Sequence, residues 1–230
     1  IKLDWAIVDY NVRQEFGIRV GRVKMPRGLY NEALDLDMAR PQILMPQSVY
    51  DARLRDFSAS FDGGMFYGNV GLGQFGSLDY RLFLGKIGMD VGTGASDYFN
   101  NDAPFPVLDI GMDSIHGGSL MWNTPLNGLR VGYSYSSFND FMSDRLVIIP
   151  GVFEAEVRKI TDAHERHLFS VEYIVGDWTF AAEGGREESA YVLSNPMGGA
   201  PSALTFNSLY GYLSAARRLT PWLELGAYYS

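Results

Sequence analysis

The feature that most constrains this chain is the alternation of apolar and polar side chains over runs of about ten residues. In the clearest run, 128–138, one face holds Leu129, Val131, Tyr133 and Tyr135. The other face carries small and polar side chains: Arg130, Gly132, Ser134 and Ser136. Because successive side chains of a strand point to opposite sides, this run predicts a strand with one apolar and one polar face.

The same alternation recurs along the chain. Clear strands are expected at 15–24, 77–86, 166–175, 178–188 and 222–230, and weaker ones at 3–10, 56–70, 115–123 and 207–217. In 56–70 the apolar face switches after Asp62-Gly63-Gly64, which predicts a β-bulge. The chain therefore contains about ten strands, within the range of membrane barrels.

Short and long connections alternate between these strands. Short ones are expected at 11–14, 71–76, 124–127, 176–177 and 218–221, and long ones at about 26–55, 89–114, 139–165 and 189–206. We expect a hairpin above the membrane at 146–160 and a flexible tip at 194–205. Outer-membrane barrels have this asymmetry of short periplasmic turns and long extracellular loops. The prediction is an all-β fold, a transmembrane antiparallel up-and-down β-barrel, with residues 1–230 as a single domain.

Composition is compatible with a barrel in the membrane. The chain has 26 Gly, 14 Tyr and 14 Phe, and no stretch reaches the ~18 apolar residues of a transmembrane helix. Aromatic side chains near strand ends fit an interfacial girdle: Trp5, Tyr10, Phe16, Trp122, Phe138, Trp178 and Trp222. The alternative is a soluble β-sandwich or lipocalin-like barrel, in which the apolar face points inward. It is disfavoured because Arg, Gly and Ser on the polar face would make a poor core.

Charge and cysteine content exclude several function classes. The net charge of −8 argues against nucleic-acid binding. Without Cys there are no disulfides and no thiolate metal sites. The chain begins at Ile1 and ends at Ser230 within an expected strand, so we expect a removed signal peptide or a fragment of a longer protein.

Residues 16–55 carry a resemblance to a known family. Residues 17–31 read Gly-x-Arg-x-Gly-Arg-x-Lys-x-Pro-x-Gly-Leu-Tyr-Asn, and 40–50 read Arg-Pro-x-x-x-x-Pro-x-Ser-x-Tyr. Together with 62–64 and 76–80, these motifs resemble the Gram-negative outer-membrane porins, particularly the phosphate-selective and porin-like proteins. The resemblance is specific over about 1–90.

The resemblance implies a porin in the bacterial outer membrane, in contact with its lipid. It implies passive diffusion of small hydrophilic solutes or anions, often through a homotrimer. Barrels of this family are longer than this chain, so about ten strands would form part of a larger barrel of about 16.

Basic residues concentrate in 19–55, and loop 26–55 is the candidate constriction if it folds into the lumen. Its acids would then face arginines, and rings of charged side chains select ions. The pore candidates are Arg19, Arg22, Lys24, Arg27, Asp35, Asp37, Arg40, Arg53, Arg81 and Arg130. An excess of basic groups would favour anions. The alternative is that these are ordinary solvated charges, paired with one another.

No other constellation indicates chemistry. Asp35 and Asp37 lie in 34–40, an expected helical turn, without the pattern of a calcium loop. His164 and His167 are expected at a loop-to-strand junction, on opposite faces. His116 and Ser119 are odd-spaced and also face opposite sides. We expect no enzyme, cofactor or metal. The alternatives to a porin are a non-transport barrel, adhesin-like or structural, and a soluble ligand-binding β-domain.

Overall fold

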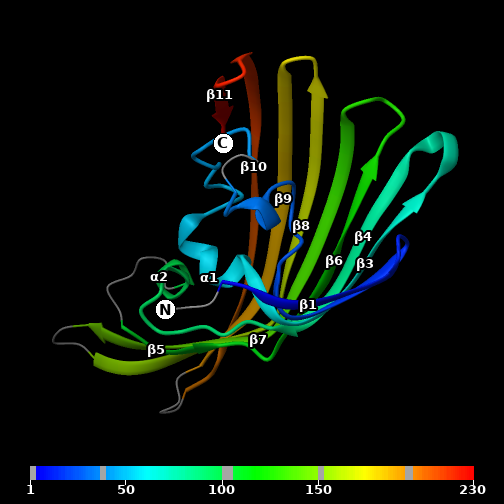
Figure 1. Cartoon of the computed structure of the whole chain (residues 1–230). Helices are drawn as coiled ribbons and strands as arrows, with labels where there is room; N and C mark the ends of the chain where they lie inside the picture. Colours follow the sequence, from blue (N-terminus) through cyan, green and yellow to red (C-terminus); the bar gives the residue numbers. More distant parts are fainter. Residues whose placement is uncertain (1–3, 37–39, 100–105, 150–152, 195–198) are drawn as a thin grey trace.

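The computed structural model describes residues 4–36, 40–99, 106–149, 153–194 and 199–230. It shows a strongly curved all-β sheet with helical segments on its concave side (Figure 1). The strands are β1 (Ala6–Arg13), β2 (Phe16–Lys24), β3 (Ser60–Gly71), β4 (Ser77–Lys86), β5 (Val107–Gly111), β6 (Ser114–Asn123), β7 (Leu129–Ile149), β8 (Phe153–Val175), β9 (Trp178–Ser194), β10 (Ser202–Thr220) and β11 (Leu223–Tyr229).

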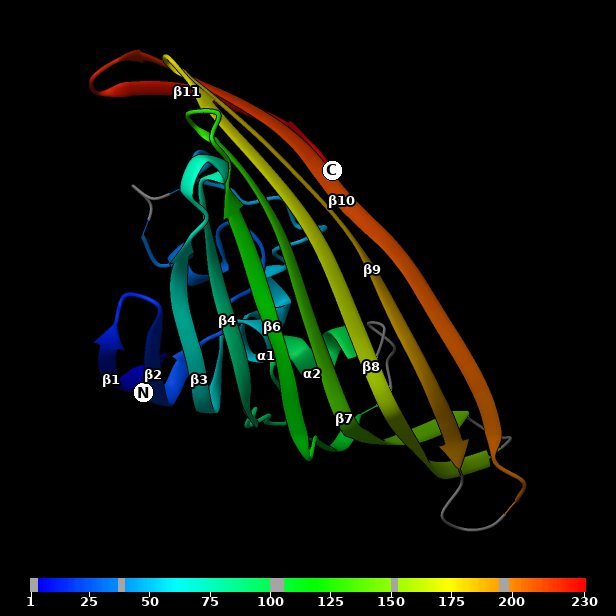
Figure 2. The ribbon, with the colours of Figure 1, turned by 90° about the vertical axis from the view of Figure 1, so that its right-hand side faces the viewer.

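The sheet is antiparallel and follows chain order. Its strand order is β1-β2-β3-β4-β6-β7-β8-β9-β10-β11, and β5 pairs with the far half of β7. The short turns gather at one end of the sheet (Figure 2). Strands β1 and β11 form the two edges, and within the described ranges they pair only with β2 and β10. The predicted antiparallel all-β sheet is confirmed, and this chain forms it as an open, curved wall.

Two connections expected as loops are largely strand. Strands β7 and β8 stay paired as far as Ile149 and Phe153, so most of 139–165 is a hairpin. Strands β9 and β10 stay paired as far as Leu193 and Ser202, so most of the loop expected at 189–206 is strand. Of the tip expected at 194–205, residues 202–205 belong to β10, and 195–198 lie outside the described residues. The hairpin expected at 146–160 is the far part of the β7–β8 hairpin, and its residues 150–152 lie outside the described residues. The other extensions were not predicted, because backbone pairing continues there without clear alternation.

The structure differs from the expected element bounds at three further places. Strand β1 begins and ends later than the expected 3–10. The long connection 89–114 contains helix α2 (Gly94–Phe99) and β5. The first part of 56–70 is helix α1 (Arg55–Ser58).

The bulge predicted at Asp62-Gly63-Gly64 is wrong. These residues pair in regular register with both β2 and β4. A Cβ at Gly63 would overlap the carbonyl oxygen of Leu84, so this glycine permits close approach of two strands.

The main irregularity of the sheet lies further along the chain. Asp140 on β7 has a φ of 50°, and the register of β8 shifts between Thr161 and Ala163. Beyond this point the β7–β8 hairpin runs across one end of the wall, beside β5 (Figure 1). The bend brings the strand ends toward α2.

The two faces of the wall differ as alternation predicts. On β8, Ser170 and Leu168 are buried on the concave side, whereas Phe169 is 63% exposed on the convex side. On β9, Glu183 is buried and Phe180 is 41% exposed. The face assignments for these strands are confirmed. No helix in the described part of the chain is long and apolar enough to cross a membrane.

The concave face holds two buried apolar clusters, which the sequence analysis did not expect. One gathers around Phe57 and Phe138, whose rings stack with centroids 4.4 Å apart. The other contains Tyr30, Tyr50 and Leu168. Phe138 is fully buried, so its expected place in an interfacial girdle is wrong. Its partner Phe57 comes from α1, and this contact across the fold leaves no local signal in the sequence.

Candidate functional site

The segment 25–59, which joins β2 to β3, lies against the concave face and is here named the inner segment (Figure 1). It contains the 3-10 helices η1 (Asn31–Ala33) and η3 (Ala52–Leu54), followed by α1. Pro26 and Pro46 are buried within it and interrupt regular structure. Of the helical turn expected at 34–40, residues 34–35 form a turn in which the Leu36 N–H donates to the Ala33 carbonyl oxygen at 2.9 Å, and 37–39 lie outside the described residues.

Glu183 of β9 anchors the inner segment to the wall. Its buried carboxylate accepts hydrogen bonds from the Tyr50 hydroxyl and from the Leu29 backbone N–H, at 2.9 Å for Leu29. Tyr212 and Ser170 donate from the wall itself, at 2.9 and 2.6 Å. Burial, and then the nearby Glu183 carboxylate, raise the pKa of Tyr50 well above its usual value. The phenol therefore stays protonated and remains a donor.

A second anchor forms at Glu172 of β8. It accepts hydrogen bonds from the Tyr30 hydroxyl and from Nε of Arg130, both at 2.7 Å. A further contact reaches β7, where the backbone N–H of Gly28 donates to Ser134 Oγ at 3.0 Å. Gly28 has a φ of +62°, which a glycine adopts without strain. Arg130 thus fastens the inner segment indirectly, through a carboxylate on the wall.

Arg19 of β2 and Arg81 of β4 converge on Glu32 of the inner segment. The distances from their guanidinium nitrogens to the Glu32 carboxylate are 3.8 and 3.2 Å. Arg19 also bonds Asp9 at 2.8 Å and lies over the Tyr67 ring, 4.3 Å from its centroid. We name Arg19, Arg81, Glu32 and Asp9 the Glu32 cluster. Carboxylates from β1 and from the inner segment thereby meet arginines of the wall.

A cavity of about 350 Å³ lies near the bend of β8, and a smaller one lies beside the Glu32 cluster. This smaller cavity measures about 210 Å³ and is lined by Arg19, Arg81, Tyr67 and Asp79, among others. Asp79 accepts hydrogen bonds from Asn69 and from Asn123 of β6, at 2.7 and 2.8 Å. The walls are polar and carry both signs of charge, which suits water and small hydrophilic solutes.

Lys24 and Asp35 form another contact of the inner segment. Lys24 Nζ and Arg55 Nη2 both lie 2.8 Å from the Asp35 carboxylate. The hydrogen bond from Lys24 lowers the pKa of Asp35 below its usual value, against a smaller opposing effect of burial. Arg22 bonds Ser60 and lies 3.6 Å from Asp62 on β3. Arg22 therefore pairs along the sheet and is not part of the Glu32 cluster.

The remaining candidates lie apart from one another. Arg27 is buried and donates to the Val49 carbonyl oxygen at 2.6 Å. Arg40 donates to the Ile43 carbonyl oxygen at 3.2 Å. Arg53 bonds Asp51 at 3.0 Å, and Asp37 lies outside the described residues. The predicted candidates that the structure describes therefore occupy several places: Arg19 and Arg81 share the Glu32 carboxylate, and Lys24 pairs with Asp35.

Sequence reasoning missed the buried tyrosines and carboxylates that hold the inner segment. Glu172 and Glu183 were expected only as members of polar strand faces. Each is an isolated acid among small and apolar side chains, which is a usable signal that a buried partner exists. Their partners are distant in sequence: Tyr30 lies 142 positions before Glu172, and Tyr50 lies 133 positions before Glu183.

The two histidines of β8 face opposite sides, as predicted. His164 is buried on the concave side and bonds Ser189 of β9. His167 bonds the Tyr133 hydroxyl at 2.7 Å on the other side. Both lie within β8, so the expected loop-to-strand junction is wrong. The described residues contain no group of three or more His, Cys, Asp or Glu side chains arranged to hold a metal ion.

No protein-family model, curated protein or solved structure matches this chain.

Proposed function

We propose that this chain forms part of the wall of an outer-membrane channel for small hydrophilic solutes. The inner segment narrows the path, and the Glu32 cluster lines it. One observation carries the proposal: a curved antiparallel sheet with an apolar convex face and a polar, charged concave face on which a long segment is folded. Rings of charged side chains in such a lumen select ions by field and size.

The convex face is suited to lipid. Large apolar side chains on it are exposed, including Phe169 at 63% and Leu209 at 83%. Soluble monomers rarely expose contiguous apolar patches larger than a few hundred Å². In a bilayer the same face needs no cover, because hydrocarbon is its solvent.

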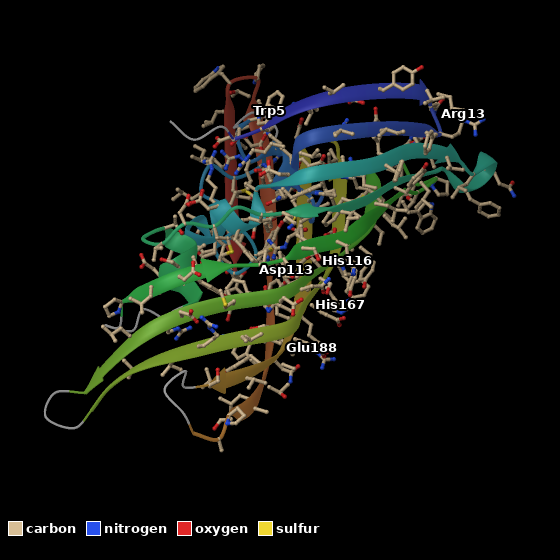
Figure 3. All side chains as sticks on the ribbon, turned by 90° about the horizontal axis from the view of Figure 1, so that it is seen from below. Trp5, Arg13, Asp113, His116, His167 and Glu188 are labelled. Atoms are coloured by element: carbon tan, nitrogen blue, oxygen red, sulfur yellow. The ribbon has the colours of Figure 1, made fainter. Side chains whose placement is uncertain are left out.

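The apolar band on the convex face ends at a tryptophan on one side and at polar residues on the other. Trp178 lies near a short turn at one end of β9, and Arg186 lies eight positions further along. At about 3.4 Å per residue that distance is roughly 27 Å, comparable with the ~25 Å apolar band of outer-membrane barrels. His116, His167 and Glu188 continue the polar side of this boundary across neighbouring strands (Figure 3).

Pairing at the edges supports a barrel larger than this chain. Among the residues that the structure describes, strands β1 and β11 each pair with one neighbour. Each unpaired backbone group in hydrocarbon costs several kcal/mol, so open edges do not occur in lipid. Further strands, to a total of about 16, would complete the wall.

The test is electrical. Full-length protein, refolded in detergent and added to a planar bilayer, is expected to insert with stepwise increases in current. Heat-denatured protein in the same detergent is the matched control and should give no steps. Folded protein that inserts without conductance would contradict the channel.

A structural or adhesin-like β-domain is the second candidate. The buried clusters around Phe57 and Tyr50 favour it, because they fill part of the concave face with side chains. A filled lumen blocks solutes. Exclusion of chloride and small sugars by vesicles that contain correctly folded protein would favour this candidate.

A further inference from the structure

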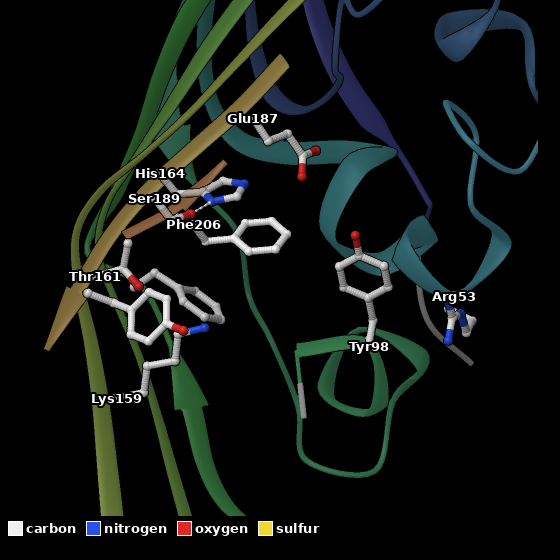
Figure 4. A pocket seen from close by; sticks show the side chains of 10 residues that line it. Arg53, Tyr98, Lys159, Thr161, His164, Glu187, Ser189 and Phe206 are labelled. Atoms are coloured by element: carbon white, nitrogen blue, oxygen red, sulfur yellow. Dashed lines mark hydrogen bonds between the residues drawn. The ribbon is translucent and has the colours of Figure 1, made fainter. Parts of the chain in front are cut away.

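The cavity of about 350 Å³ lies where the bent ends of β8 and β9 face α2 (Figure 4). Lys159, Thr161 and Ser189 line it from the wall, and Tyr98 of α2 faces them across the opening. Its volume falls within the ~300–1,000 Å³ of small-molecule sites. The cavity is separate from the Glu32 cluster, with which it shares no lining residue.

Lys159 supplies positive charge without an acidic partner. Among the described residues, no carboxylate lies within 4.0 Å of its ammonium group, which instead lies 4.1 Å from the centroid of the Tyr191 ring. The one acid that lines the cavity, Glu187, is ion-paired with Arg166 at 2.7 Å. Arg53, at the opposite side, bonds Asp51 at 3.0 Å. The cavity therefore has one cation available to an incoming anion.

The rest of the lining is mainly aromatic. Tyr98, Phe141, Tyr191 and Phe206 contribute rings from four different elements. Aromatic side chains bind a planar apolar group through offset or edge-to-face contact. A simple inorganic anion could bind Lys159, but it has no apolar group to contact these rings.

We infer that this cavity binds a small carboxylate that carries an aromatic ring, with its carboxylate at Lys159 and its ring among the aromatic side chains. The inference rests on the proposed function and deepens it, because it names the class of solute that pauses at this end of the channel. Ligand sites combine an apolar body with a few placed polar groups in this way.

Isothermal titration of the full chain in detergent tests the inference, with benzoate, benzamide and acetate as probes. Benzoate is expected to bind at least tenfold more tightly than either. Benzamide keeps the ring without the charge, and acetate keeps the charge without the ring. Equal affinity for benzoate and benzamide would overturn the role of Lys159, and equal affinity for benzoate and acetate would overturn the aromatic part.

A pair of variants locates the site. Lys159→Gln is expected to weaken benzoate binding at least tenfold, whereas Lys86→Gln, which changes an exposed lysine at the end of β4, should leave it unchanged. Unchanged affinity in folded K159Q would overturn the inference. If K159Q does not fold, the comparison of benzoate, benzamide and acetate binding to the wild-type chain still tests the inference.

The titration needs no bilayer, so the two proposals can fail separately. Conductance without preferential benzoate binding refutes only this inference. Benzoate binding without conductance refutes only the channel.

Discussion

At the scale of single residues, the fold depends most on Glu183. Four donors converge on its two carboxylate oxygens, and two of them belong to the inner segment. Glu183→Gln replaces one acceptor oxygen by a donor NH₂, which leaves buried donors facing each other. Leaving a buried group unsatisfied costs about 1–3 kcal/mol.

We therefore expect Glu183→Gln to lower the free energy of unfolding by about 1–3 kcal/mol. Glu188→Gln is the matched control, because Glu188 lies on the same strand with its neighbour Arg186 at the surface. Urea unfolding in detergent, monitored by tryptophan fluorescence, measures the free energy of unfolding of both variants. Equal unfolding midpoints for the two variants would contradict the anchoring role.

In the proposed channel, we expect charge selection to depend on Glu32. It compensates both Arg19 and Arg81, so Glu32→Gln leaves two guanidinium groups with less opposing charge. We expect the reversal potential in a salt gradient to shift toward that of chloride. Glu224→Gln, at the β10–β11 turn, removes the same charge away from the cavity and serves as control. A shift of equal size in both variants would show that net charge alone is responsible.

Asp35 makes one contact of the inner segment dependent on pH. Because Lys24 lowers its pKa in the folded state, Asp35 adds stability above its ordinary pKa. That stability is lost as the pH falls through the lowered value. The unfolding midpoint of the wild type should therefore exceed that of Asp35→Asn at pH 7, and the two should converge in acid. A difference that persists at low pH would show that the contact does not depend on the carboxylate charge.

At the scale of elements, alternation predicted the faces of β7, β8 and β9, because one side of each strand meets apolar surroundings and the other polar ones. It failed where strands continue beyond the apolar band, as in the β7–β8 hairpin past Asp140. It also predicted a bulge at Asp62-Gly63-Gly64 from a switch of the apolar face, whereas regular β3 carries apolar side chains on both faces: Phe61 and Met65 are buried and Phe66 is exposed. The polar-face arginines of the site were predictable, but their shared partner Glu32 depends on the path of the inner segment.

The lipid-facing role of β8 can be tested by one substitution. Val171 lies in the middle of the exposed apolar row of this strand. An arginine at a bilayer midplane costs about 2–4 kcal/mol, whereas an exposed site in water is nearly neutral. We expect Val171→Arg to lower folding stability in lipid vesicles by this amount. Asn207→Arg, beyond the polar boundary on β10, should change it little, and equal small effects would contradict immersion of β8 in lipid.

At the scale of the whole molecule, three features favour a channel wall. Within the described ranges the curved sheet ends at β1 and β11, its convex face is apolar, and its concave face carries the inner segment, a polar cavity beside the Glu32 cluster and a largely aromatic cavity near α2. None of these could be read from one strand alone. They depend on the register of the neighbouring strands and on contacts between the inner segment and the wall.

The most direct test of this account is conductance across a planar bilayer after insertion of the full-length, folded protein. The account predicts discrete current steps that heat-denatured protein does not give, and a larger unit step when residues 34–44 of the inner segment are replaced by a shorter Gly-Ser linker. Folded protein that inserts into the bilayer and passes no current at any voltage would contradict it.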